Sequence, residues 1–257
     1  MDKIKVELIS ADKLSDVQVA CEMTRSMGKY GEPADFTKKE YWTNEKLNKM
    51  LHLPHSKIAR FTDFKFIITG SSRRFLSQLI THHIGCDIMS GSLQYSDLSN
   101  LSMPIKDMFV VPYEIICHDL RYDNDNLKSA FLNQCTESWY AYKDLRMRGI
   151  DNDTAGYLMP MASRNNLLVK VNLEELMYIA NQRLCRRNTS ETRYVVGLMV
   201  EEVIKQLGID DELFMPTCYS RPCQEGKYSC GCPVNFSKIS ELLDFDFQKI
   251  RDGRKGN

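Results

Sequence analysis

Basic side chains between residues 164 and 193 are the most obvious groups that could do chemistry. Six cations fall within these thirty residues: Arg164, Lys170, Arg183, Arg186, Arg187 and Arg193. A guanidinium group binds phosphate through two parallel hydrogen bonds, and Arg183 and Arg187 have the i, i+4 spacing that shares one helix face. The cluster predicts a phosphate site. The alternative is a solvated basic helix end that complements the helix dipole.

The overall charge makes this local cluster important. The 257 residues contain 34 Lys and Arg against 34 Asp and Glu, so the net charge is zero. This balance argues against a broadly basic protein that binds nucleic acid. An anionic ligand must therefore be held by neighbouring cations and not by the field of the whole protein. Since no run of about eighteen apolar residues occurs, we expect no membrane span.

Two adjacent histidines form a second candidate. His82 and His83 end a helical pattern and precede a Gly- and Ser-rich stretch, Gly85 to Ser102. Small polar residues there would let backbone N–H groups approach an anion or a flat heterocycle. The pair is thus a candidate ligand contact. The alternative is that both histidines are exposed or cap the end of the helix.

Nine cysteines, an odd number, form the third feature. Because Met1 to Lys5 lacks the apolar core of a secretory signal, we expect reduced thiols and a cytoplasmic protein. Four cysteines fall within fifteen positions: Cys218, Cys223, Cys230 and Cys232. Four thiolates could hold Zn²⁺, but the spacing is not the usual paired CxxC. A structural metal, disulfides and free thiols all remain open.

The periodicity of apolar residues predicts the elements that carry these groups. Alternation predicts strands over residues 3–9 and 61–69. Helical spacing and capping residues predict helices from about 10 to 27 and over 37–51, 73–84, 126–148, 151–158, 172–187 and 190–207. Without a βαβ rhythm or a GxGxxG loop, we expect an α+β fold with a mainly antiparallel sheet flanked by helices. The expected domains are 1–210 and a Cys-rich C-terminal extension, 211–257.

Three segments together resemble one known family. Ser77 to Cys86 and Ser90 to Ser96 are similar to the signature R-H-R-x-x-S-x-N-x-x-S-x-R-Y of flavin-dependent thymidylate synthases. Asn172 to Arg183 is similar to the family's N-x-R-x-L-x-N…L-R segment, and Asn188 to Arg193 to its A-Q-x-E-I-R. The resemblance covers roughly residues 3–210.

The resemblance implies a reaction and its partners. Such enzymes convert dUMP to dTMP with methylenetetrahydrofolate, FAD and NADPH, without an enzyme nucleophile, and work as homotetramers with shared sites. An arginine at the position of Arg183 is implied to polarise the pyrimidine ring. Physically, this is electrostatic stabilisation of a developing anion, while the cofactor carries the redox chemistry.

The resemblance also assigns site residues by position. Those expected to contact the nucleotide are Gln78, Ser90, Gly91, Ser92, Leu93 and Gln94, with Arg164 on the phosphate, from a neighbouring subunit in the assembled protein. Those expected to contact FAD are Thr81, His82, His83, Asn172, Glu174, Tyr178 and Arg187.

The chain departs from the family pattern at several of these positions. Thr81, His83, Gln94 and Glu174 stand where the patterns have Arg; the other departures are Cys86 for Ser, and Ile88 and Tyr178 for Asn. Removing one charge-assisted hydrogen bond costs roughly 1.5–3 kcal/mol. Cations that could compensate are Arg73, Arg74, Arg186 and Arg187. Two alternatives follow: flavin-dependent C5 modification of a different pyrimidine nucleotide, or a non-catalytic homologue that acts as a binding or assembly protein.

Overall fold

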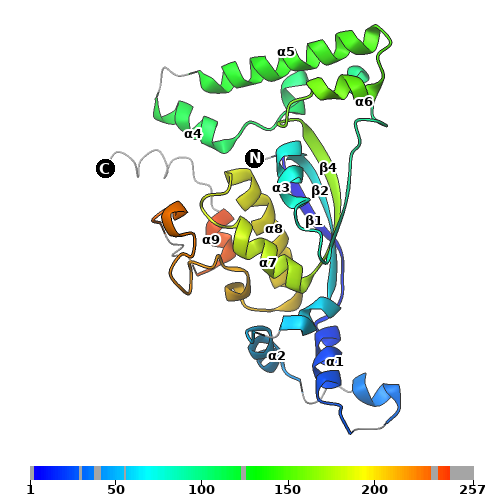
Figure 1. The fold of residues 1–257 in the computed structure, drawn as a ribbon, viewed down its shortest axis with the longest axis vertical. Helices are drawn as coiled ribbons and strands as arrows, with labels where there is room; N and C mark the ends of the chain where they lie inside the picture. The colour runs from blue at the N-terminus through cyan, green and yellow to red at the C-terminus, as the bar shows by residue number, and fades with distance from the viewer. Residues whose placement is uncertain are drawn as a thin grey trace.

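A four-stranded antiparallel sheet forms the centre of the protein (Figure 1). The computed structural model describes residues 3–28, 31–37, 42–54, 56–122, 126–232 and 237–243. The strands lie in the order β1-β2-β4-β3, and their bounds are Lys5–Ala11 (β1), Asp63–Ser72 (β2), Cys86–Ser90 (β3) and Arg164–Asn172 (β4). The predicted α+β fold with an antiparallel sheet is confirmed.

Two of the four strands were expected from the sequence. The alternating segments 3–9 and 61–69 correspond to β1 and β2, each displaced by about two residues. The Gly- and Ser-rich stretch from Gly85 to Ser102, in which no strand was expected, contains β3 at its start; β3 pairs with β4 from Cys86 opposite Val171 to Ser90 opposite Leu167. β4 itself was not predicted. It begins with Arg164, Asn165 and Asn166, a polar start that hides the strand pattern.

Some helices pack against the sheet, and others lie beyond its two ends. Their bounds are Leu14–Thr24 (α1), Asn44–Leu51 (α2), Arg73–Leu79 (α3), Tyr113–Arg121 (α4), Leu127–Met147 (α5), Asn152–Ala155 (α6), Leu173–Arg183 (α7), Ser190–Leu207 (α8) and Ile239–Leu243 (α9). Within the described ranges, none of these helices is long and apolar enough to cross a membrane.

The predicted helices are confirmed in most cases, with shorter ends. The helix expected over 37–51 is reduced to α2, preceded by a 3₁₀ turn at Pro33–Thr37, and residues 38–41 lie outside the described residues. α3 stops at Leu79 and α7 at Arg183. Thr189, not Ser190, caps α8, and Gly208 ends it with a φ of 65°. α4 was not expected. Of the predicted extension, residues 233–236 and 244–257 lie outside the described residues.

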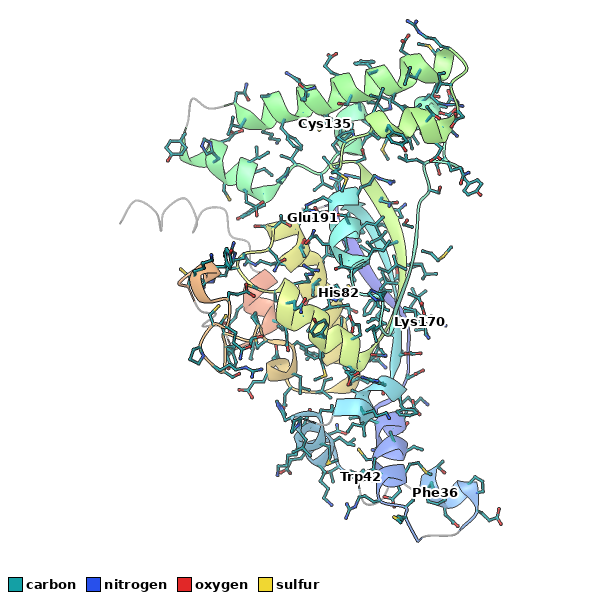
Figure 2. All side chains as sticks on the ribbon, in the orientation of Figure 1. Phe36, Trp42, His82, Cys135, Lys170 and Glu191 are labelled. Atoms are coloured by element: carbon teal, nitrogen blue, oxygen red, sulfur yellow. The ribbon has the colours of Figure 1, made fainter. Side chains whose placement is uncertain are left out.

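Within the described residues, helices cover only one face of the sheet. Phe64, Phe66 and Ile68 of β2 are fully buried and belong to the same core as residues of α7 and α8. The alternate positions face the other way: Ile67 and Leu168 are exposed, and Lys170 lies on the side away from these helices (Figure 2). This alternation is the period-two pattern of a strand with one wet face.

A second, smaller core holds the α4–α6 end of the molecule. Its buried members are Met108, Phe109, Cys135, Trp139, Tyr142, Ala155 and Met159. Asp97 ties the preceding loop to this core by accepting hydrogen bonds from Ser99 Oγ at 2.6 Å and Arg146 Nη2 at 3.1 Å. The Ser99 bonds and then the Arg146 guanidinium hold the pKa of Asp97 well below its usual range.

Substitutions on the two faces of β2 should differ sharply in effect. Phe66→Ala empties a fully buried site and should lower the free energy of unfolding by about 3–5 kcal/mol. Ile67→Ala, one residue on and 39% exposed, should cost less than about 1 kcal/mol. Urea denaturation followed by circular dichroism measures both. Equal losses would contradict the one-sided core.

Candidate active site

Arg183, the last residue of α7, contacts predicted residues at the end of α3 and just after it. Its Nε donates to Nε2 of His82 at 3.0 Å, and its Nη1 donates to Oε1 of Gln78 at 3.2 Å. Nη2 donates to the backbone oxygen of Gln78 at 3.1 Å and to Oγ1 of Thr81 at 2.8 Å. Gln78, which was expected to contact the nucleotide, and Thr81 and His82, which were expected to contact FAD, thus bind the same guanidinium group. Burial lowers the pKa of Arg183.

The same contacts determine the protonation state of His82. A guanidinium N–H can only donate, so Nε2 of His82 must accept and carry no proton. The proton then lies on Nδ1, which donates to Oε1 of Glu175 at 3.1 Å. Burial, followed by the charge of Arg183, lowers the pKa of His82 to about 4, whereas burial raises the pKa of Glu175. His82 is therefore a buried, neutral imidazole that accepts a hydrogen bond from Arg183 and donates one to Glu175.

Two capping residues hold the helices that carry this cluster. Ser72 caps α3 by accepting from the backbone N–H of Phe75 at 3.0 Å. Glu191 of α8 accepts from both the N–H and the hydroxyl of Ser72, each at 2.6 Å, and lies beside α3 in Figure 2. Burial raises the pKa of Glu191, against the effect of these two bonds. On the other side, Asn172 caps α7 by accepting a hydrogen bond from the N–H of Glu175 at 2.9 Å.

The residues expected to contact FAD divide into available and engaged groups. Thr81, His83 and Tyr178 are exposed beside the cluster, and the Tyr178 ring meets the His82 ring edge-on at 5.8 Å. The Asn172 side chain is engaged in its cap, and Glu174 accepts a hydrogen bond from Arg60. Arg187 donates to the backbone oxygen of Tyr228, away from this cluster.

The residues expected to contact the nucleotide also divide. Gly91, Ser92, Leu93 and Arg164 line a cavity of about 530 Å³ between the sheet and the loop that follows β3, whereas Gln78 lies on Arg183. Ser90 and Gln94 are exposed and do not line this cavity. The structure therefore places the predicted site in two parts of the same chain.

The cavity residues that were not assigned to a ligand from the sequence include Arg73, Ser163 and Asn165. Arg73 lines the cavity beside Ser163, whose backbone oxygen accepts from the Arg73 N–H at 2.9 Å, and Asn165 follows on β4. Arg73 stood out only as one of several spare cations. Ser163 and Asn165 carried no sequence signal, because pairing of β2 with β4 brings them to Arg73.

The basic cluster predicted between residues 164 and 193 is not a single surface. Arg164 lines the 530 Å³ cavity, and its guanidinium donates to the backbone oxygens of Gly70 at 2.5 Å and Asp107 at 2.9 Å. Arg186 and Arg187 line a different cavity, and Arg193 is half-buried on α8. Residues that are close in sequence are separated because α7 ends at Arg183 and α8 begins at Ser190.

Thiols line that second cavity, which measures about 400 Å³. The four clustered cysteines line it together with Cys185 from the end of α7, and all five are free. Among the described residues, no three Cys, His, Asp or Glu side chains form a group that could hold a metal ion. A metal would have to gather these thiols, so the metal site at Cys218, Cys223, Cys230 and Cys232 stays a prediction.

Because the thiols are not gathered, we expect them to react as free cysteines. A thiol reagent added to the native, reduced protein should label the exposed Cys223, Cys230 and Cys232 first. Cys21 and Cys86 should react last, since burial raises their pKa values to about 11 and about 12. Mass spectrometry of digested samples assigns each site. One tightly held zinc per chain that protects the exposed set would contradict this expectation.

Comparisons with known proteins agree with the fold. The family described as Thymidylate synthase complementing protein (Thy1) matches residues 7–207. A flavin-dependent thymidylate synthase of Pyrococcus abyssi is 30% identical over 177 residues, which cover 64% of this chain and 69% of that protein.

Two solved structures share the fold at low sequence identity. ThyX of Helicobacter pylori, solved with FAD and dUMP, has a TM-score of 0.59 at 16% identity and covers 77% of this chain and 92% of its own. The UMP/dUMP methylase PolB of Streptomyces cacaoi, bound with 5-Br dUMP, has a TM-score of 0.60 at 17% identity, with coverages of 80% and 91%. From the family match and the curated relative, the chain belongs to the flavin-dependent thymidylate synthase family.

Proposed function

We propose that the protein catalyses reductive methylation of dUMP to dTMP, with FAD as cofactor and methylenetetrahydrofolate and NADPH as co-substrates. The observation that carries this proposal is Arg183, held by Gln78, Thr81 and His82 at the surface end of α7. The similarity to ThyX of Helicobacter pylori, which was solved with FAD and dUMP, supports the same choice. By resemblance to its family, the active form is a homotetramer.

The role of Arg183 follows from its surroundings. Its charge is partly desolvated and its guanidinium plane is fixed by four hydrogen bonds, so little reorganisation is needed when a negative charge develops nearby. A pyrimidine whose carbonyl oxygen takes up charge during C5 substitution is such a partner. Gln78 and Thr81 orient the guanidinium group, and neutral His82 leaves its positive charge uncompensated.

The exposed groups beside Arg183 suit a flat cofactor. His83 offers a hydrogen-bonding group, and Tyr178 offers an aromatic face that is 52% exposed. This set fits an isoalloxazine or adenine ring, and FAD, when bound, would supply the reducing equivalents. Glu174 fits a pyrophosphate poorly, but its pairing with Arg60 offsets its charge.

A different pyrimidine nucleotide is the second candidate substrate. Gln94 replaces an arginine of the family signature and lies exposed outside the 530 Å³ cavity. The fold is also shared with PolB, described as a UMP/dUMP methylase. Thermal melting with UMP, dCMP and dUMP separates the candidates, because a selectively bound ligand raises the melting temperature.

The visible spectrum of the purified protein tests the flavin assignment. We expect yellow protein with bound flavin, and NADPH oxidation that accelerates when dUMP is added. Protein that is colourless and cannot be reconstituted with FAD would refute the proposed reaction. A stable oligomer that binds neither FAD nor a nucleotide would instead indicate a non-catalytic binding or assembly protein.

Removing the guanidinium group of Arg183 should abolish most of the turnover. We expect Arg183→Ala to lower kcat by about 10²–10³, the usual cost of losing one charge-stabilising donor. The matched control is Arg148→Ala, which removes an exposed arginine at the end of α5. Single-turnover kinetics and far-UV circular dichroism separate loss of chemistry from loss of folding. Unchanged turnover in Arg183→Ala would remove the assigned role.

The neutral state of His82 gives a pH dependence with a definite sign. Its pKa is about 4 in the folded protein against 6.5 ordinarily, so the unfolded chain binds the extra proton between these values. Stability should therefore fall as pH drops from about 6.5 to 4, by up to about 3 kcal/mol from this group. The raised pKa of Glu175 acts in the opposite sense, because a folded-state acid that holds its proton more tightly gains stability as pH falls.

Comparison with His82→Gln isolates this contribution. Glutamine can accept from Arg183 and donate to Glu175 but does not titrate. The stability difference between wild type and variant, measured by urea denaturation, should shrink as pH falls from 7 to 4. A difference that stays constant over this range would show that His82 is not held neutral.

A further inference from the structure

The 530 Å³ cavity has a cationic side and an apolar side. Lys3, Arg73 and Arg164 provide three positive charges, and Asp107 provides one negative charge through its ion pair with Lys3 at 2.6 Å. Leucine and methionine side chains line the remainder: Leu93, Leu98, Leu101, Met103, Met108 and Met159. A site of this size and composition suits a small ligand with a doubly charged anionic end and a less polar body.

Of the three cations that line the cavity, Arg73 is the one whose side chain is available to a ligand. Lys3 is paired with Asp107, and Arg164 donates to two backbone oxygens. The guanidinium group of Arg73 makes no hydrogen bond or ion pair with any other residue in the described part of the chain. Its backbone is nevertheless fixed by the 2.9 Å hydrogen bond to Ser163, so its position at the cavity wall is defined.

Two buried polar groups beside Arg73 also lack partners. Ser163 is 3% exposed and Asn165 is 8% exposed, and both line the cavity. Within the described residues, neither Oγ of Ser163 nor Nδ2 of Asn165 has a hydrogen-bond partner. Because a buried donor without an acceptor costs about 1–3 kcal/mol, such groups in a cavity wall are expected to bind a ligand atom or a water molecule.

The orientation of Asn165 shows which kind of ligand atom is missing. Its Oδ1 accepts from the N–H of Asn166 at 2.9 Å, so the free group is the amide N–H, a donor. Gly91 lies directly against it: a Cβ there would come within 2.6 Å of Oδ1. The loop thus packs against the amide oxygen of Asn165, and the amide N–H requires an acceptor such as a phosphate oxygen.

We propose that Arg73, Ser163 and Asn165 form the subsite that binds the phosphate of the nucleotide substrate. The proposal rests on the nucleotide substrate proposed above. In this subsite Arg73 supplies the positive charge that Gln94, standing where the family signature has arginine, does not carry. The Asn165 amide and the Ser163 hydroxyl donate to phosphate oxygens, and Arg164 holds the cavity wall through Gly70 and Asp107.

The test compares dUMP with deoxyuridine, which lacks the phosphate, by calorimetric titration of the full-length protein. Arg73→Gln should weaken dUMP binding about tenfold to hundredfold and leave deoxyuridine binding unchanged. Arg148→Gln is the matched control, because Arg148 is exposed, pairs with Asp144 and does not line the cavity. It should leave the affinity for both ligands as in the wild type.

Asn165→Asp provides a second variant of nearly unchanged shape. It replaces the free donor with a negative charge, so dUMP binding should weaken at least as much as in Arg73→Gln. Circular dichroism and the melting temperature show whether each variant folds.

The outcomes separate the subsite from the reaction. If wild type binds dUMP and Arg73→Gln binds it equally well, the subsite is wrong and the proposed reaction stands. Suppose that the wild type binds dUMP and that Arg73→Gln weakens the binding of dUMP but not of deoxyuridine. If the wild type then holds no flavin, the subsite stands and the reaction is wrong. If wild type binds no dUMP, the subsite is overturned as well.

Discussion

The inability of a guanidinium group to accept a hydrogen bond organises the whole candidate site. Arg183 donates to His82, which makes His82 accept at Nε2, and His82 must then donate from Nδ1 to Glu175. This chain of bonds joins the end of α3 to two positions on α7. It also explains why the site needs rigid support from behind, because a guanidinium group shifted by about one ångström would lose several partners together. The Glu191–Ser72 contact and the Asn172 cap provide that support.

Much of the fold could be predicted from the sequence, where one physical signal dominated. Alternation identified β1 and β2, and long apolar stripes identified α5 and α8. β3 was missed because a five-residue edge strand has almost no periodic signal and forms only by pairing with β4. β4 was missed for a related reason: its polar first residues become buried or engaged only in the folded sheet.

The site was predicted unevenly, and the reason is the same. Gln78, Thr81, His82 and Arg183 lie in two short segments whose order resembles a family signature, so resemblance could name them before any contact was known. Arg73, Ser163 and Asn165 belong to no such segment, and only the β2–β4 register brings them to one cavity. The prediction of one basic cluster was wrong because the turn between α7 and α8 separates in space residues that are close in sequence.

The two hydrophobic cores have a consequence for how the molecule opens. Phe109 pairs with Ser163, so the α4–α6 end joins the sheet next to the 530 Å³ cavity, whose wall contains residues of both parts. Proteins open locally in roughly contiguous cooperative units, and we expect each of these two cores to form the centre of one such unit. A ligand in this cavity touches both units and must be released before they part. Occupancy would therefore turn two independent opening events into one.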